Sequence, residues 1–283
     1  MTEAKVATIR RRPRAAAERN GQVQSLTRAF SILNAIAEAE GGVGLTEVAQ
    51  QVGLPPSTTH RLLTTLQQEQ FVRFDSERAL WSVGVQSFIV GNAFLRDRRL
   101  VQTARPHMRA LMEESGETVN LAVEDDGQAI FLYQVECRQM MRALTTLGSR
   151  VPLHCSGVGK ALLMAMSEAR RAKILHRHGL ARLTAKTIVR PADLKADLEA
   201  SCRRGYAQDD EEHAVGLRCV AATILDELGE AVGAISVSGP AARITDDRMA
   251  MLGAMVRRSA EAITRDYGGQ RPRQAAAATD KER

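Results

Sequence analysis

The sequence of 283 residues lacks an apolar run long enough to cross a membrane, which takes about 18 residues or more. Its longest candidate, FIVGNAFL at 88–95, is far shorter. The N-terminus has no apolar segment of the secretory type. Its four cysteines form no C-x-x-C pair, so neither a disulfide framework nor a zinc ribbon is expected. These absences favour a cytoplasmic protein with reduced thiols and no membrane partner.

The motifs of common hydrolases are absent as well. Neither H-E-x-x-H nor G-x-S-x-G occurs. SGVGK at 156–160 departs from a phosphate-binding loop, because His154 replaces its first glycine and Ala161 its Ser or Thr. His154 and Cys155 are neighbours in an extended segment, so their side chains point apart and cannot form a nucleophile–base pair. We therefore expect a binding protein with no cofactor and no metal; the alternative, an enzyme with an appended DNA-binding domain, would turn its ligand over.

Charge is unevenly distributed along the chain. The net charge is +6, and residues 1–20 hold six basic against two acidic side chains, which gives +4. Such an arm binds polyanions or is merely solvated, and residues 1–22 show no periodicity. We predict disordered tails at 1–22 and 269–283, with two domains between them.

Three helix patterns follow the basic tail. From Ser25, apolar residues recur at helical spacing until Gly41-Gly42, and a second helix with Thr46 as its expected N-cap stops at Gly53. Pro55-Pro56 opens a third helix, which runs to about Gln68. The strand-like segments FVRF (71–74) and LWSV (80–83) are joined by a polar turn, which predicts a hairpin. Residues 23–84 are therefore predicted to form a winged helix-turn-helix domain.

The third helix, PSTTHRLLTTLQQ, carries leucines on one side and hydrogen-bonding side chains on the other. The second helix of such a motif lies in the major groove of DNA, with its N-terminal residues against base edges. Arginine suits the O6/N7 edge of guanine, and hydroxyls serve base or phosphate. The candidate DNA-binding residues are Ser57, Thr58, Thr59, His60 and Arg61 on the helix, with Arg73 and Arg78 on the hairpin. The alternative is a helical hairpin that binds protein or caps a core.

Residues 85–115 look helical in two segments, with irregularities expected at Gly91 and Pro106. The stretch VQSFIVGNAFL is too apolar for a solvated linker. We predict a linker and dimerisation helix at 85–100 that packs against a second subunit, because a helix-turn-helix protein needs two copies to read a two-fold site. The alternative is that this helix packs on its own domain.

From residue 117 the period becomes that of strands. TVNLAVED, QAIFLYQVE and MRALTTLG read as strands, then helices follow at about 157, 168–178 and 192–204. Strand patterns return at GYAQDDEE, LRCVAATILDE and AVGAISVSG, before a last helix at about 246–266 capped by Thr245. Strands grouped in this way predict an α+β domain over 101–268 with a largely antiparallel sheet.

This second domain carries the pattern of a small polar binding site. Ser156 can cap a helix that begins at Gly157, where free N–H groups attract an anion and small residues allow close approach. Ser236 and Ser238 share one strand face, and Cys219, Ala221 and Thr223 share another. Such faces suit a small polar ligand; the alternative is that they are simply small core residues.

Along residues 24–268 the chain resembles the IclR family of bacterial transcription regulators. The matching segments include LTEVAQQVGLPPSTTHRLLTTLQQEQFVR, PLHCSGVGKALL and RGYAQDDEEHAVGLRC, with a G-x3-D-x2-E-x6-C signature at Gly205, Asp209, Glu212 and Cys219. The likeness is greatest to the glyoxylate-responsive members. It implies a winged helix-turn-helix, a linker helix and a C-terminal GAF/PAS-like effector-binding domain.

The resemblance also implies ligands and partners. Matched residue by residue, the effector-binding residues are Gly157, Val158, Asp209, Cys219, Ser236 and Ser238. Leu217 and Val151 match an apolar patch of the family, in which Ala143 replaces a methionine. The implied partners are double-stranded DNA with a pseudo-palindromic operator, a small carboxylate effector, glyoxylate foremost, and further copies of the chain in a homodimer or homotetramer. An activator rather than a repressor, or another effector such as pyruvate or an aromatic acid, remains open.

Overall fold

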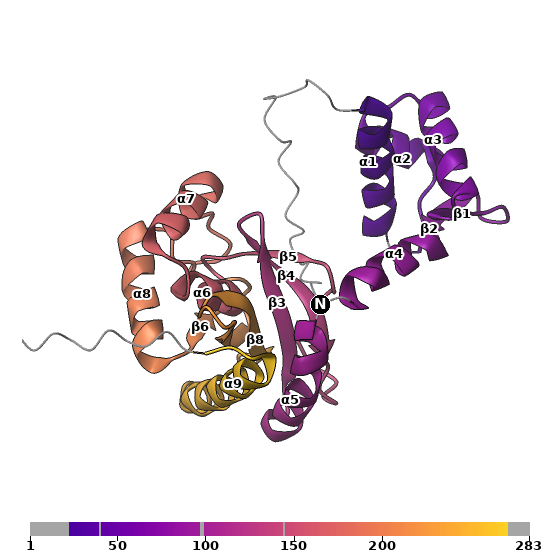
Figure 1. Cartoon of the computed structure of the whole chain (residues 1–283). Coiled ribbons are helices and arrows are strands. Elements are labelled where there is room, and N and C mark those ends of the chain that lie inside the picture. Colours follow the sequence, from indigo (N-terminus) through magenta and orange to yellow (C-terminus); the bar gives the residue numbers. More distant parts are fainter. Residues whose placement is uncertain (1–22, 40, 97–98, 144, 271–283) are drawn as a thin grey trace, which may run out of the picture. The chain divides into compact units, whose positions relative to one another are not determined.

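The computed structural model describes residues 23–39, 41–96, 99–143 and 145–270 (Figure 1). The chain divides into two compact units, Met1–Phe94 and Leu95–Arg283, and each is described by itself. The boundary falls within the segment predicted as the linker. The tails predicted at 1–22 and 269–283 lie outside the described residues, except for Gly269 and Gln270. These two residues do not belong to a disordered tail, because their N–H groups donate to the carbonyls of Thr264 at 2.7 Å and Asp226 at 3.0 Å. Within the described ranges, no helix is both long and apolar enough to span a bilayer.

The first unit is a winged helix-turn-helix, as predicted. Its elements are α1 (Gln24–Glu38), α2 (Leu45–Val52), α3 (Pro56–Gln68), β1 (Val72–Asp75) and β2 (Leu80–Val83). β1 and β2 pair antiparallel, and Val43 adds an isolated bridge to Trp81. The buried side chains that hold it together are Ile32, Ile36, Val43, Val48, Leu63, Val72 and Trp81.

Glycine and proline set the tight turn between α2 and α3. Gly53 ends α2 with φ 66°, a left-handed conformation that favours glycine, and its N–H reaches the carbonyls of Ala49 and Gln50. Pro56 then occupies the first turn of α3, where no intrahelical N–H bond is lost. The predicted cap at Thr46 was wrong, because Gly44 precedes the helix and Thr46 already lies in its first turn.

Two helices connect the units, as the sequence predicted. α4 spans Val85–Arg96 and crosses the boundary, and α5 spans Arg99–Ser115. α4 continues through Gly91 and α5 through Pro106, so neither residue ends its helix. Leu100 is buried in the core of the second unit, so the start of α5 already belongs to that unit.

A six-stranded sheet forms the centre of the second unit, in the order β5-β4-β3-β8-β7-β6 with every neighbouring pair antiparallel. Its strands are β3 (Thr118–Asp125), β4 (Gln128–Val135), β5 (Arg150–Pro152), β6 (Ala207–Asp210), β7 (Leu217–Leu225) and β8 (Ala231–Pro240). The predicted strand MRALTTLG was wrong: residues 141–143 and 145–148 form a loop, and only Arg150–Pro152 pairs with the β4 edge. The turn at Gly148, with φ 80°, ends the loop.

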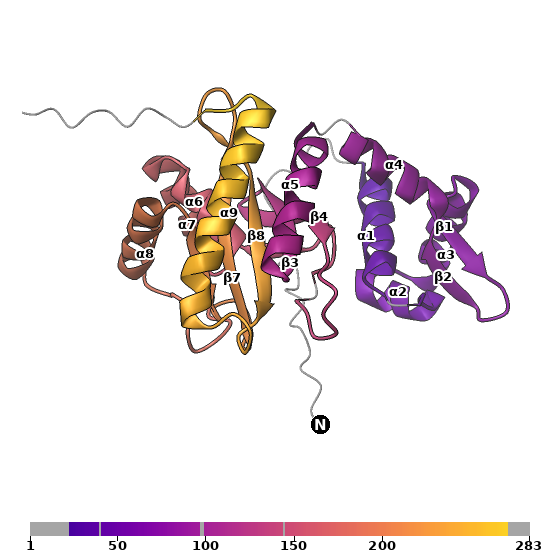
Figure 2. The ribbon, with the colours of Figure 1, turned by 90° about the horizontal axis from the view of Figure 1, so that it is seen from below.

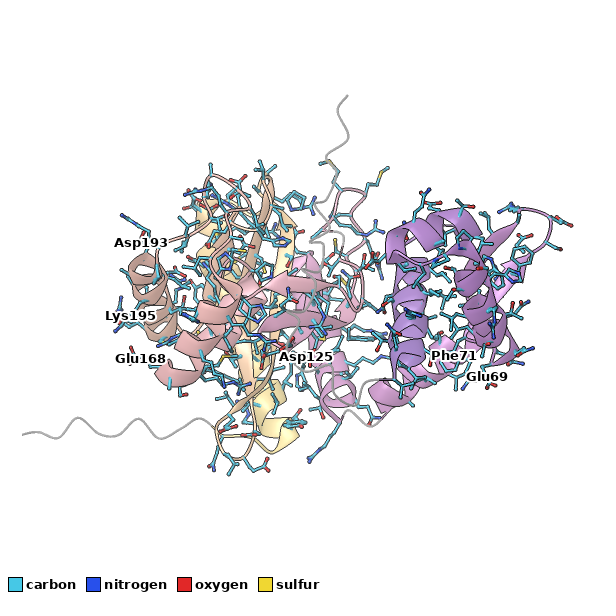
Figure 3. The ribbon with its side chains drawn as sticks, turned by 90° about the horizontal axis from the view of Figure 1, so that it is seen from above. Glu69, Phe71, Asp125, Glu168, Asp193 and Lys195 are labelled. Carbon is cyan, nitrogen blue, oxygen red and sulfur yellow. The ribbon has the colours of Figure 1, made fainter. Side chains whose placement is uncertain are left out.

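Helices cover both faces of this sheet. α5 and α9 (Asp246–Tyr267) lie side by side over one face, as Figure 2 shows. α6 (Gly157–Met164) packs on the other face. α7 (Glu168–His178) and α8 (Pro191–Arg204) follow on that side, where Lys195 and Glu168, both labelled in Figure 3, form an exposed ion pair of 3.4 Å.

Alternation along the strands gives the two faces different chemistry. Val119, Val220 and Val237 face α5 and α9 and belong to the larger apolar core. Their neighbours point to the α6 side, where the side chains are small or polar. This division positions the candidate site between α6 and the sheet.

Candidate functional site

The predicted reading helix presents its polar face to solvent. Ser57, His60 and Arg61 are exposed, and Thr58 is half-buried. Leu63 on the opposite side is fully buried, which anchors α3 to the core of the first unit. The first two turns of α3 are therefore available to a partner, as a major-groove helix requires.

Thr59 does not belong to this surface, which corrects the prediction. Its side chain is 0% exposed and its Oγ1 donates to the carbonyl of Pro55 at 3.1 Å. A threonine in the first turn of a helix readily bonds back to the carbonyl four residues earlier. Thr59 therefore stabilises the start of α3 and cannot contact DNA.

The hairpin carries two exposed arginines, as predicted. Arg73 on β1 donates from Nε to Ser82 Oγ on β2 at 2.8 Å. Arg78 lies in the turn, where Asp75 Oδ1 accepts its backbone N–H at 3.2 Å. Both side chains line a hollow of about 390 Å³ beside the C-terminal end of α1. The hairpin therefore has cations free to meet phosphate.

In the second unit, sheet register brings the predicted effector residues together. Cys219 on β7 pairs with Asp209 on β6 and with Ser238 on β8. In the next row, Ala221 pairs with Ser236. All of these side chains point to the α6 face. Residues up to 29 positions apart in sequence, from Asp209 to Ser238, thus form one polar cluster.

The N-terminus of α6 lies directly over this cluster. Ser156 is its N-cap: Oγ accepts from the N–H of Gly159 at 3.2 Å and donates to the carbonyl of Pro152 at 2.7 Å. The N–H of Lys160 bonds to the carbonyl of Ser156, which leaves the N–H groups of Gly157 and Val158 outside the intrahelical pattern. Such groups at a helix N-terminus bind anions.

The cluster is closed and internally hydrogen-bonded. The exposed fractions of Val158, Asp209, Cys219, Ser236 and Ser238 are all 6% or less. Ser238 Oγ donates to Cys219 Sγ at 3.2 Å, and the two serine hydroxyls are 3.5 Å apart. A ligand must therefore open this cluster to enter.

Asp209 is the acidic member of the cluster. Its Oδ1 accepts the backbone N–H groups of Glu212 at 2.8 Å and His213 at 3.3 Å. Burial, with help from the charge of Glu212, raises the pKa of Asp209 to about 7. Near neutral pH this carboxyl is thus present in both forms, and its neutral form can donate a hydrogen bond to an anion.

Two family models together cover most of the chain. The model described as bacterial transcriptional regulator IclR C-terminal matches residues 92–265, and the IclR helix-turn-helix domain model matches residues 25–76. The chain belongs to the IclR family. It is a bacterial transcriptional regulator of that family and not an enzyme.

Relatives with high identity extend over nearly the whole chain. The acetate operon repressor of Salmonella typhimurium (strain LT2) is 55% identical over 253 residues, which cover 89% of this chain and 92% of the relative. The transcriptional repressor IclR of Escherichia coli (strain K12) is 53% identical over 259 residues, or 91% and 94% of the two chains. The repressor AllR of the same strain is 42% identical over 245 residues, or 87% and 90%.

Solved structures of the IclR family share the fold. The Thermotoga maritima IclR superposes with a TM-score of 0.74 at 29% identity, covering 87% of this chain and 100% of that one. An IclR homologue from Microbacterium hydrocarbonoxydans, solved in complex with 4-hydroxybenzoate, has a TM-score of 0.75 at 22% identity over 86% and 98% of the chains. At that identity the second comparison concerns the fold alone.

A buried lysine next to the site forms ion pairs with two acidic residues, and its role was not predicted from the sequence. Lys160 is 0% exposed, and its Nζ lies 2.5 Å from Glu212 Oε1 and 3.0 Å from Asp197 Oδ2. Burial alone would lower the pKa of Lys160, but the two carboxylates outweigh it and raise the pKa, so the ammonium stays charged. The glutamate of the IclR-family signature thus ties the loop after β6 to α6. The lysine within the otherwise apolar helix sequence GVGKALLM was the feature from which this buried ion pair could have been predicted.

The cysteine is a polar contact rather than a nucleophile. Burial raises the pKa of Cys219 to about 12, because it disfavours the thiolate. A neutral thiol is a weak donor and acceptor, whereas the thiolate is the reactive form. This environment agrees with the regulatory rather than catalytic character of the IclR family.

The predicted apolar patch is only partly formed. Val151 and Ala143 are both 7% exposed, and Leu217 is half-buried two residues before Cys219 on the same strand face. Ala143 and Val151 are small for such a patch. A ligand with a short apolar end fits this composition better than a large one.

Proposed function

We propose that this chain is a DNA-binding repressor whose operator binding is controlled by a small 2-oxo acid, with glyoxylate the first candidate. The single observation that carries the proposal is the α6 N-terminus over the row of Asp209, Cys219 and Ser238. Two backbone N–H groups and the helix dipole favour a carboxylate there. The hydroxyls of Ser238 and of Ser236 in the next row supply donors for a second oxygen. The buried, small-residue site favours a short acid.

The first unit supplies the DNA contacts. Arg61 and His60 on α3 would meet base edges, while Arg73 and Arg78 would meet phosphate. A pseudo-palindromic operator requires two copies of this unit. Large apolar side chains on the surface support self-association, since Phe88 of α4 is 68% exposed and Phe30 of α1 is 60% exposed. We expect a homodimer or homotetramer.

Control by an effector requires two arrangements of the protein that differ in affinity for the acid. The acid would favour the arrangement with lower operator affinity. The alternatives are an activator, in which the acid favours the DNA-binding state, and a regulator that senses pyruvate or an aromatic acid. The small side chains at the α6 face argue against an aromatic ring.

The test is a gel-shift titration with DNA from upstream of the chain's own gene and of adjacent metabolic genes. Glyoxylate, pyruvate and 4-hydroxybenzoate would be added separately at millimolar concentration. Release of a specific complex by glyoxylate supports the proposal. A specific complex that ignores all three acids rejects the effector, and the absence of any specific complex rejects the DNA-binding role.

Substitutions of the predicted residues test whether this cluster binds the effector. Cys219→Ala and Ser238→Ala should weaken glyoxylate binding in titration calorimetry and leave operator binding unchanged. Thr223→Val is the matched control, because Thr223 lies on the same strand face but donates to the Ala161 carbonyl at 2.6 Å. Equal affinities for glyoxylate in all four proteins would remove the site from this cluster.

A further inference from the structure

The polar cluster continues past the predicted residues onto two more strands. Asn120 on β3 pairs with Ser236 on β8, and Gln134 on β4 pairs with Asn120. Asn120 is 1% exposed and Gln134 is half-buried. The row that begins at Ala221 beneath Gly157 therefore runs through Ser236 to two carboxamides. Neither carboxamide was expected from the sequence.

Hydrogen bonds orient the amide of Asn120. Its Oδ1 accepts from Gln134 Nε2 at 3.0 Å, so its Nδ2 faces the opposite way, toward the serines. Nδ2 donates to Ser238 Oγ. A carboxamide has two N–H donors, and its direction is assigned from such a network. The donor end of Asn120 thus points into the effector cluster.

The bond that Asn120 makes there is weak. Its length of 3.4 Å exceeds the usual range for N–H···O bonds, which ends near about 3.2 Å. The hydroxyl of Ser238 meanwhile directs its own proton to Cys219. A buried donor with a long bond loses free energy relative to water, and a better placed acceptor would recover it. A ligand oxygen is such an acceptor.

We propose that Asn120 is a further effector-binding residue that donates from Nδ2 to the 2-oxo oxygen of the acid held at the α6 N-terminus. It thereby selects 2-oxo acids over acids that lack this oxygen. The inference rests on the proposed function. Gln134 is a positioning residue, which holds the Asn120 amide with its donor end toward the ligand.

The reach of the Asn120 side chain supports this assignment. Neighbouring strands are about 4.8 Å apart, so the backbone of β3 lies two strands, or roughly 10 Å, from β7, which a short acid cannot span. The Asn120 side chain closes part of this gap, because its Nδ2 lies 3.4 Å from Ser238 Oγ, which in turn lies 3.2 Å from Cys219 Sγ beneath Gly157. On the β6 side the 2-oxo oxygen would instead meet Asp209, which can donate only when its carboxyl is protonated. A neutral amide provides the donor without adding charge to a buried site.

The experiment compares pairs of acids that differ only in the 2-oxo group. Titration calorimetry would measure pyruvate against propionate and glyoxylate against acetate. In the wild-type protein we expect the oxo acid to bind about tenfold more tightly, the worth of one well-made buried hydrogen bond. In Asn120→Ala this ratio should fall to about two or less. In Gln134→Ala it should fall only in part.

Asn120→Asp is the second variant, because it keeps the shape and the acceptor for Gln134 but loses the donor once its carboxyl is ionised, so it is measured above pH 7. Its charge lowers affinity for every acid, so the ratio within each pair is the criterion. Thr223→Val is the control whose ratio should not change. A wild-type ratio retained in the Asn120 variants overturns this inference and leaves the proposed function intact. A wild-type protein that binds none of the four acids overturns both.

Discussion

A Cβ atom on Gly157 would lie 2.6 Å from Sγ of Cys219. Real Cβ atoms do not approach other atoms so closely, so the first residue of α6 rests on β7 without room for a side chain. Two features of the proposed site, the helix N-terminus and the thiol, are therefore held in direct contact. A larger residue at position 157 or at position 219 would therefore clash with the other.

Gly157→Ala should destabilise the protein and weaken effector binding. The new methyl group must displace the Cys219 sulfur or lift α6, and overpacking of this kind costs about 1–3 kcal/mol. Urea unfolding measures the stability, and calorimetry with glyoxylate measures the binding. In Gly157→Ala/Cys219→Ala the sulfur is gone, so the two stability losses should not add. Strictly additive losses would mean that the two residues do not press on each other.

Ser156→Ala should lower the free energy of unfolding by about 1 kcal/mol, because the N-cap of α6 loses the oxygen that accepts from Gly159. Effector affinity should fall as well, since the first turn of α6 holds the anion. Ser167→Ala is the matched control: Ser167 caps α7 by accepting from the N–H of Arg170, and α7 buries no residue. Its loss should leave effector affinity unchanged. Equal effects on affinity would contradict the role of the α6 N-terminus.

Asp209→Asn should make stability less dependent on pH. The folded-state pKa of Asp209 is raised from 3.8 to about 7, so folding favours its protonated form. This contribution is complete below about pH 4 and is lost as pH rises through about 7. The variant cannot ionise, so relative to it the wild type should lose on the order of 3 kcal/mol between pH 4 and pH 8. Urea unfolding at several pH values would show this; parallel curves for the two proteins would refute it.

Lys160→Met should destabilise the second unit strongly, by about 3–5 kcal/mol, because Glu212 is left buried without its cation, whereas the half-buried Asp197 keeps Arg204 at 3.7 Å. Lys160→Met/Glu212→Gln removes one of those charges and should recover part of the loss. Thermal unfolding followed by circular dichroism provides the comparison. A double variant no more stable than the single one would show that Glu212 gains little from Lys160.

Arg61→Ala should weaken operator binding by about 1–3 kcal/mol, as expected for an arginine that contacts a base. Thr59→Val is its control, because Thr59 lies only two residues from Arg61 in α3 but is fully buried. That variant should alter the stability of the first unit rather than DNA affinity. Fluorescence anisotropy with labelled operator measures the DNA affinity of both variants. Wild-type affinity in Arg61→Ala would show that α3 is not the reading helix.

Local patterns were enough to predict much of this fold. Pro56, Gly53 and the leucines of α3 act within a few residues, and the predicted limits of α3 and α7 agree with the structure. Side chains whose roles depend on distant partners were missed. The position of Asn120 follows from pairing with Ser236, 116 residues away, and only its polarity within the apolar run TVNLAV hinted at a role. Lys160 likewise finds its carboxylates on α8 and in the loop after β6.

The strand-like composition of MRALTTLG misled for a related reason. A segment becomes a strand only where a sheet edge is free to pair with it, and β4 offers its edge to Arg150–Pro152. Thr59 misled because helical spacing alone does not separate a hydroxyl that faces DNA from one that bonds back to its own backbone. In both cases the residue types were suitable and the available partner decided the outcome.

The central strands have no face turned to water. Along β7, Cys219 and Ala221 face α6 while Val220 and Ala222 face α5 and α9, and all four are buried. A substitution in β7 therefore meets two constraints: the side chain must suit the ligand chemistry of the site, and it must fit a closely packed interior. Changes of effector preference within this architecture are thus confined to swaps of nearly equal volume on the α6 side, such as serine, cysteine, alanine and threonine for one another.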